Sequence, residues 1–317
     1  MIEATGSKPV RSTKIKKGMA CELSENGGVA KHGFDTRIVR YEEIHKVTGK
    51  DYEALVRAID PKPGEVIFEG CAGYADVSKH VIDAAADFDE KPEIYILDES
   101  PVQINRAREE LRVLPDDHVL LGDIRITGLP DDKFDKAVIK MGVHELPQAE
   151  QSKVFREMHR ILRPGGKFIM WDLSLDQDTQ KAFQDIIRKK DELAGFDMLV
   201  TNRYFQRHDE LEKLFEEAGF QDVRDEHRIR YVFNPKGRID ELVSKDRLQM
   251  MGERGKLSPE DEESLRQTGQ ERVDALIAYI RERVSALSEA IREKIEYKDL
   301  GSDIEMTFDK IVMSGKK

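Results

Sequence analysis

The segment GEVIFEGCAGYADVSK (residues 64–79) joins an apolar run to a turn of small residues and the start of a helix. This order predicts a strand that ends in Glu69, a tight turn through Gly70 and Gly73, and a following helix. Small side chains let a ligand approach the turn, and free N–H groups at the helix start can bind a carboxylate. A ligand with a carboxylate and an ammonium group would suit this turn. Close packing of the strand on the helix would require the same small residues.

The same alternation of apolar run and helix recurs along the chain. The further runs are IYILD (94–98), VLLGD (119–123), FDKAVIKMGV (134–143) and RPGGKFIMWD (163–172). Alternating strands and helices predict a parallel sheet covered on both faces, and ligands of such sheets bind beyond the carboxyl ends of the strands. Glu69, Asp98 and Asp123 close the first three runs. We therefore expect three acids at one crevice, facing an amino group, a ribose diol and an adenine amine.

In their order, these motifs resemble the class I S-adenosylmethionine-dependent methyltransferases, and most closely the ubiquinone/menaquinone-biosynthesis group. The resemblance covers residues 36–232. It rests on PKPGEVIFEGCAGYADVSK, LDESPVQINRARE, LLGDI, FDKAVIKMGVHEL and VFREMHRILRPGGKFIMWDLS. It implies an α/β fold with a Rossmann-like seven-stranded sheet, helices on both faces and an N-terminal helical lid.

The resemblance also implies S-adenosyl-L-methionine as the cofactor and S-adenosyl-L-homocysteine as the product. It puts Glu69 and Gly73 near the methionine moiety, Asp98 at the ribose hydroxyls, and Asp123 with Ile124 at the adenine. The other implied cofactor positions are Gly70, Cys71, Glu99, Lys140 and Met141. Two positions depart from the family pattern, because Cys71 and Ala75 stand where glycine is commonest. Both side chains are small, so we interpret the site as altered and not as lost.

The acceptor side of the site has less specific candidates. His144 follows the fourth strand and is the first candidate for a general base, since an imidazole can take a proton from a phenol, an enol or an amine. A structural histidine that binds a loop explains it equally well. In an extended chain, Glu145 would point away from His144. The other acceptor candidates, each with a structural alternative, are Tyr41, Trp171, Arg203 and Tyr204.

Composition limits the partners and the setting. The 317 residues carry a net charge of −11 with 36% charged residues, which argues against a nucleic-acid-binding surface over most of the chain. The basic run RSTKIKK (11–17) is typical of a solvated tail. Two cysteines, Cys21 and Cys71, and the lack of a signal peptide or a long apolar segment predict a reduced, cytoplasmic protein without a membrane span. No spacing of cysteine and histidine resembles a metal site.

The sequence divides into three parts. Residues 1–35 are polar without lasting periodicity, which predicts a flexible N-terminal segment. Residues 36–236 and 301–317 form the expected methyltransferase domain, which begins with two amphipathic helices on either side of Gly49 as the lid. The charged residues 237–300 interrupt the strands that would end the sheet and predict a helical insert before the last strand.

The insert carries an apolar seam at heptad spacing. Its residues are Val273, Ile277, Ile280, Val284, Leu287 and Ile291. This spacing predicts one helix that packs along its length against another helix. The partner is either a second subunit, which would make a homodimer, or an apolar set in the same chain. That set is Ile239, Leu242, Val243, Leu248 and Met251.

Two functions from different classes fit these observations. The first is an enzyme that methylates a small-molecule acceptor by in-line displacement, with the insert building the acceptor pocket or a dimer. The second is an S-adenosylmethionine-binding regulatory or scaffold protein that recruits a protein or RNA partner through the insert. The atom that receives the methyl group, and with it the need for a base, does not follow from the residues.

Overall fold

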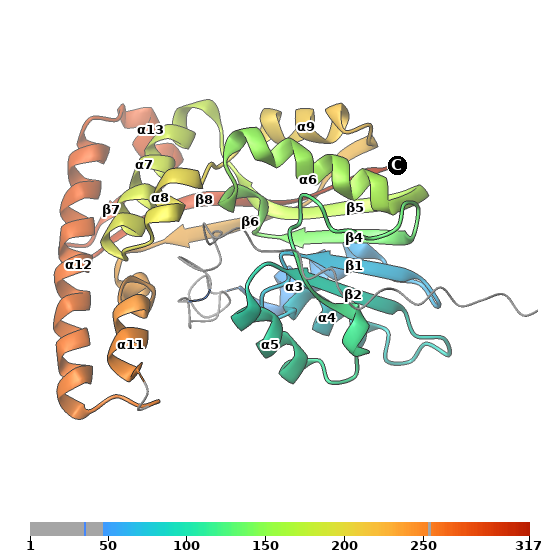
Figure 1. Ribbon diagram of the computed structural model, residues 1–317. Coiled ribbons are helices and arrows are strands. Elements are labelled where there is room, and N and C mark those ends of the chain that lie inside the picture. The colour runs from blue at the N-terminus through green and yellow to red at the C-terminus, as the bar shows by residue number, and fades with distance from the viewer. Residues whose placement is uncertain (1–34, 36–46, 253–254) are drawn as a thin grey trace, which may run out of the picture.

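The computed structural model describes residue 35, residues 47–252 and residues 255–317. In this part of the chain, one mixed sheet carries helices on both faces (Figure 1). Its strands run in the order β3-β2-β1-β4-β5-β8-β6, and the short β7 pairs with β8. Their bounds are β1 Val66–Gly70, β2 Glu93–Asp98, β3 Val119–Leu121, β4 Phe134–Lys140, β5 Leu162–Ser174, β6 Gln221–Phe233, β7 Lys298–Asp299 and β8 Ile304–Lys316. The predicted α/β fold with a helical insert before the last long strand is confirmed.

The sheet is parallel from β3 to β5, and only its far side is antiparallel. β8 pairs antiparallel with both β5 and β6. β1 lies between β2 and β4, and its residues alternate between two cores. Ile67 packs in the core under α3 and α4, whereas Phe68 packs with Phe134 on the other face. This two-sided burial explains why the strands are continuous apolar runs in the sequence.

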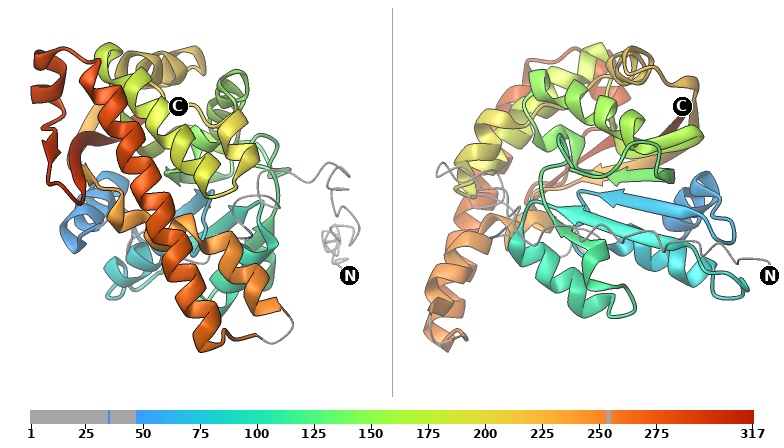
Figure 2. Two further views of the ribbon diagram at one scale, coloured as in Figure 1. Left: turned by 90° about the vertical axis from the view of Figure 1, so that its left-hand side faces the viewer. Right: turned by 45° about the vertical axis from the view of Figure 1, so that its right-hand side comes forward.

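The helices form two layers on the sheet. One face carries α3 (Gly49–Ile59), α4 (Asp76–Ala84) and α5 (Pro101–Glu110), and the other carries α6 (Gln148–Ile161) and α9 (His208–Glu217) (Figures 1 and 2). α7 (Gln177–Leu193) and α8 (Asp197–Asn202) lie between this second layer and the insert. Short 3-10 turns are η2 (Asp116–His118), η3 (Val143–Glu145) and η4 (Lys236–Arg238). The first predicted lid helix, with Tyr41, lies outside the described residues.

The insert contains α10 (Ile239–Leu242), α11 (Ser244–Met251), α12 (Pro259–Ser285) and α13 (Glu289–Lys294). α12 starts at the N-cap Ser258, whose hydroxyl accepts the N–H of Asp261, and acids fill its first turn. In Figure 1 it stands beyond the carboxyl ends of the parallel strands, beside α11 and α7. The insert is therefore at the edge of the sheet where a ligand would bind.

The seam of the insert packs against the same chain. Val273, Ile277, Ile280 and Val284 are buried in one cluster with side chains of α7 such as Phe183. α10 also lies close to α12. A Cβ atom added to Gly269 of α12 would be only 2.7 Å from the side chain of Ile239 in α10. The seam therefore packs only in part against the predicted apolar set of the same chain. Its packing against α7 was not predicted. No second subunit is needed to bury these residues.

The prediction of one helix as far as Ile291 is wrong. α12 ends at Ser285, and a new helix, α13, starts at the N-cap Ser288, whose hydroxyl accepts the N–H of Ile291. Leu287 lies in the turn between α12 and α13 and still packs against the cluster that contains Ile280 and Val284. After the break, Ile295 belongs to the buried cluster, whereas Ile291 is only half-buried. None of the helices in the described ranges is long and apolar enough to cross a bilayer.

We expect Ile280→Asp to destabilise the monomer strongly, because it would place a carboxylate at a site with 0% exposure between α12 and α7. A loss of more than about 3 kcal/mol in the free energy of unfolding is expected. The matched control is Ala278→Asp, on the exposed face of the same helix. Urea unfolding and sedimentation would measure both variants. A folded variant with unchanged stability and half the native mass would show instead that the seam joins two subunits.

Candidate active site

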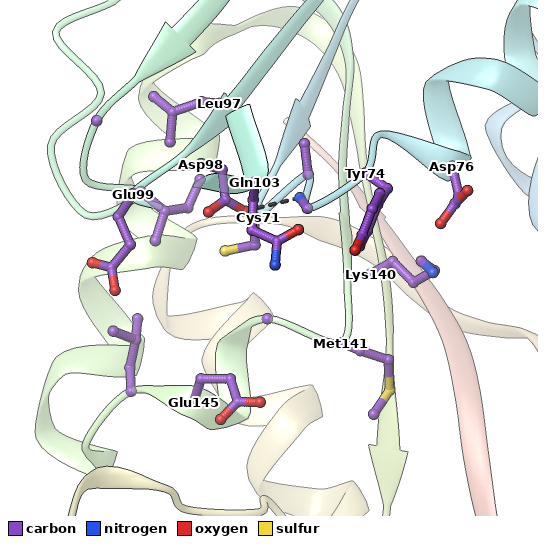
Figure 3. A pocket seen from close by; sticks show the side chains of 16 residues that line it. Cys71, Tyr74, Asp76, Leu97, Asp98, Glu99, Gln103, Lys140, Met141 and Glu145 are labelled. Carbon is purple, nitrogen blue, oxygen red and sulfur yellow. Dashed lines mark hydrogen bonds between the residues drawn. The ribbon is translucent and has the colours of Figure 1, made fainter. Parts of the chain in front are cut away.

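A cavity lies beyond the carboxyl ends of β1, β2 and β4. The predicted cofactor residues that line it are Cys71, Gly73, Asp98, Glu99, Ile124, Lys140 and Met141. Figure 3 shows Asp98 and Glu99 on one side and Tyr74, Asp76 and Lys140 on the other, with Met141 and Glu145 across from the turn. The turn after β1 and the acid at the end of β2 therefore meet, as the strand order predicts.

The turn after β1 has an unusual backbone that explains its small residues. Cys71, Gly73 and Ala75 have φ angles of 52°, 55° and 59°, in the left-handed region that favours glycine. Cys71 and Ala75 stand where glycine is commonest in the family. Because neither is glycine, each of these left-handed positions costs about 1 kcal/mol of backbone strain. A Cβ on Gly73 would meet no atom within 4 Å, so this position is open to the cavity.

Asp98 fixes the turn. Its carboxylate accepts the N–H of Gly73 at 2.8 Å and the N–H of Ser100 at 2.9 Å. Burial raises the pKa of Asp98, and these two N–H groups oppose that rise. Because each carboxylate oxygen has a second lone pair, the group can still accept the two hydroxyls of a ribose.

Glu69 lies behind the turn and does not line the cavity. Its carboxylate accepts the N–H and the hydroxyl of Ser78 in the first turn of α4, at 2.8 and 2.5 Å. Burial raises the pKa of Glu69 to about 7, although Ser78 and Lys140 favour the charged form. In this structure, Glu69 supports the helix start that follows the turn.

Asp123 and Gly70 also lie next to the cavity and not on its wall. Asp123 bonds the guanidinium of Arg125 with both carboxylate oxygens. A Cβ on Gly70 would collide with Ile124, so glycine here lets β1 approach the wall of the cavity. None of the three residues at these strand ends, Glu69, Gly70 and Asp123, is on the wall. Each lies directly behind or beside residues that do line the cavity.

We expect Glu69 to make stability fall as pH rises. Its folded pKa of about 7 lies above the ordinary 4.5, so the folded state holds a proton that the unfolded state releases between these values. The loss amounts to about 3 kcal/mol from pH 4 to pH 8. Glu69→Gln should remove this part of the slope, and the exposed Glu53→Gln should keep it. Urea unfolding across this pH range is the measurement, and an unchanged slope in Glu69→Gln would contradict the assignment.

A second, smaller cavity adjoins the first, and both are lined by Met141 and Glu145. Of the predicted acceptor residues, His144 and Arg203 line it. Trp171 lies on the opposite face of the sheet against Tyr52 of α3, with the ring centroids 5.7 Å apart. Tyr204 donates its backbone N–H to the carbonyl of His144 and borders neither cavity.

His144 is held by acids on both ring nitrogens. Its Nδ1 lies 2.6 Å from Asp172, and its Nε2 lies 3.4 Å from Glu145. The expectation that Glu145 points away is wrong, because residues 143–145 form the 3-10 turn η3 and not an extended chain. Burial alone would lower the pKa of His144, but Asp172 and Glu145 raise it to about 9. At neutral pH the ring is therefore protonated, and it would donate a hydrogen bond to an acceptor.

The ring of His144 should titrate near pH 9 in an NMR experiment, and Asp172→Asn should lower this midpoint. The stability that the charged ring contributes is complete below pH 6.5 and is lost as pH rises through 9. Asp197→Asn, an exposed change on α8, should leave the midpoint in place. A midpoint that rises or stays constant in Asp172→Asn would show that this contact does not set the charge.

A chain of buried ion pairs continues from Glu145 to the insert. Arg203 binds Glu145 with two N–H groups, at 2.7 and 2.6 Å, and binds Asp191 with a third at 2.6 Å. Lys190 lies 3.0 Å from Asp191 and 2.6 Å from Glu241 of α10. All five side chains are buried. The insert thus contributes directly to the wall of the second cavity, together with its Arg238.

Sequence reasoning missed several residues of the two cavities. Tyr74 and Gln103 line the first one, and Lys190, Arg238 and Glu241 line the second. Tyr74 follows the small residues of the turn directly, so its position was a usable signal. The charged residues of α7 and the insert gave none, because a buried ion pair looks like a solvated helix face in the sequence. No group of acids, histidines and cysteines in the described ranges could hold a metal ion.

Comparison of the sequence with known protein families gives a match over the part of the chain that forms the first cavity. Residues 67–166 match the model of a methyltransferase domain. This chain carries a methyltransferase domain. The resemblance to the S-adenosylmethionine-dependent methyltransferases, and with it the prediction of an enzyme of this family, is confirmed.

Relatives of the domain include named enzymes. An uncharacterized methyltransferase of Geobacillus sp. (strain WCH70) is 27% identical over 192 residues, which cover 59% of this chain and 84% of that protein. Demethylmenaquinone methyltransferase of Geobacillus kaustophilus is 26% identical over 211 residues, covering 60% and 87%. The YcgJ protein of Bacillus subtilis has the same fold, with a TM-score of 0.60 and 13% identity over 85% of this chain and 99% of that chain.

Proposed function

We propose that this methyltransferase binds S-adenosyl-L-methionine in the first cavity and methylates a small-molecule acceptor bound in the second. The observation that carries the proposal is the junction of the two cavities at Met141 and Glu145. A methyl donor in one cavity and an acceptor in the other would meet at this junction. Much of the catalysis then comes from holding the two reactants in line.

The residues of the first cavity suit the cofactor. Asp98 would accept the two ribose hydroxyls, and the open backbone at Gly73 lets the ligand approach the turn. Ile124 offers an apolar wall for the adenine, while Glu69 and Asp123 support the site from behind. Bound there, the cofactor supplies an electrophilic methyl group on a sulfonium. The protein shapes the cavity and would hold the two reactants at the junction.

The acceptor side is formed by His144, Arg203 and the insert. His144 donates from Nε2 to the acceptor, since Asp172 holds the other nitrogen. This role differs from a general base, which would need a neutral ring. The insert thereby belongs to the enzyme and not to a separate recruiting module. The low cysteine content supports a reduced, cytoplasmic setting for the reaction.

We expect Asp98→Ala to weaken binding of S-adenosyl-L-homocysteine by about 1.5 to 3 kcal/mol, because it removes a charged acceptor for the ribose hydroxyls. Asp89→Ala, an exposed change before β2, is the matched control and should bind normally. Calorimetry measures both affinities. Equal affinity for the two variants would contradict the proposed cofactor site.

Turnover needs its own test, which counts S-adenosyl-L-homocysteine released from S-adenosyl-L-methionine with a panel of small acceptors. Product formation above the acceptor-free rate with the unaltered protein, and its loss in Asp98→Ala, is the expected result. Tight binding of the cofactor with no product from any acceptor would favour a regulatory protein over an enzyme.

A further inference from the structure

We propose that the second cavity selects an acceptor with an ionised oxygen, such as a phenolate, an enolate or a carboxylate, on a compact flat frame. This inference rests on the function proposed above, because it names the acceptor class for the same reaction. His144 and Arg238 are the residues that would hold the ionised oxygen.

Cations outnumber acids on the wall of this cavity. Its charged lining residues are His144, Lys190, Arg203 and Arg238, against Glu145 and Glu241. Two further acids, Asp172 and Asp191, lie behind the wall and bind the cations from their far side. The surface that a ligand would meet is therefore rich in N–H donors. With these two acids, four acids balance four cations, so an anion would be held by the N–H donors that line the cavity and not by a net positive charge.

The two acids of the wall are already engaged. Glu145 receives two N–H groups of Arg203, and Glu241 receives the ammonium of Lys190 at 2.6 Å. A cationic acceptor would have to compete with these ion pairs. By contrast, the Nε2 of His144 lies 3.4 Å from Glu145, which is longer than an ordinary N–H···O hydrogen bond. This N–H is therefore only weakly engaged, and an oxygen in the cavity could accept it in place of Glu145.

Arg238 brings a second donor group from the insert. Its guanidinium lies over the rings of Tyr231 and Phe233, 5.5 and 5.2 Å from their centroids, and donates to the hydroxyl of Tyr231. Lys310 lies next to this group, with its ammonium 4.0 Å from the centroid of the Tyr231 ring. Burial together with the charges of Arg238 and Lys140 holds the pKa of Lys310 well below its ordinary value.

The remaining wall is aromatic and apolar. Phe205 stacks on the ring of His144, with centroids 4.7 Å apart, and Phe183 meets Phe205 edge to face at 5.0 Å. Phe183 and Phe233 also line the cavity. Flat rings stack and pack well against such walls. The cavity thus combines donors for an oxygen anion with flat apolar surfaces, and its volume of about 40 Å³ would hold the anionic end of an acceptor.

The chemistry balances without a base. The bond between the methyl carbon and sulfur breaks with its electron pair left on sulfur, and an electron pair of the anionic acceptor forms the new bond to the methyl carbon. No proton moves, so the step needs no neutral His144, and the ring can remain a hydrogen-bond donor to the acceptor oxygen. The acceptor anion and the sulfonium become two neutral products, which a water-poor site favours.

The test compares three small probes of one shape on the full-length protein. The probes are 4-fluorobenzoate, neutral 4-fluorobenzamide and cationic 4-fluorobenzylamine, followed by fluorine NMR at pH 7 with and without saturating S-adenosyl-L-homocysteine. We expect the benzoate to bind at least about tenfold more tightly than either of the others. Arg238→Gln and His144→Gln should each remove most of this preference, and Arg238→Lys should keep part of it. Arg230→Gln, an exposed arginine beside Tyr231 on β6, is the matched control.

The outcomes separate this inference from the function on which it rests. Equal or tighter binding of the amide or the amine would overturn the anion preference, as would no binding of any probe to a protein that binds S-adenosyl-L-homocysteine. A benzoate preference that survives both Arg238→Gln and His144→Gln would place the anion elsewhere and also overturn the proposal. Failure to bind S-adenosyl-L-homocysteine would instead refute the proposed cofactor site. The probe comparison on the unaltered protein holds even if a variant does not fold.

Discussion

The buried pair of Arg203 and Glu145 connects the parts of this molecule. Glu145 lies in η3, the turn that follows β4, where the two cavities meet, and Arg203 comes from the segment after α8. Through Asp191 and Lys190, the pair reaches Glu241 in the insert. Breaking one member of such a chain leaves its partner charged and buried, which costs several kcal/mol. The positions of the sheet, of α7 and of the insert are therefore coupled at the acceptor wall.

The fold followed from the sequence because its signals are local. A buried strand, a turn of small residues and a helix are encoded by neighbouring residues, and the order of five such units specifies the sheet. The same logic located Asp98, since a strand end at the carboxyl edge faces the crevice whatever else surrounds it. Glu69 and Asp123 are also strand-end acids, but their neighbours Ser78 and Arg125 bind the carboxylates, and neither acid lines the cavity.

The acceptor side could not be derived in this way. Whether Glu145 meets His144 depends on one 3-10 turn, and the sequence VHE does not distinguish that turn from an extended chain. Lys190, Arg238 and Glu241 are far apart in the sequence and meet only after α7 and α10 pack. A fold alone does not determine the reaction, which depends on the side chains around the cavities.

The placement of β8 also makes the second cavity depend on residues 304–316. Within the described residues, β6 pairs with β8 alone, and β8 lies between β6 and β5 although it follows the insert in the sequence. Until residues 304–316 dock on β5, β6 has no neighbour in the sheet, and Tyr231, Phe233 and Arg238 are not in place. The parallel part of the sheet, β1 to β5, needs none of them. The first cavity is therefore built from contacts within that parallel part, whereas the second depends on contacts between segments far apart in the sequence.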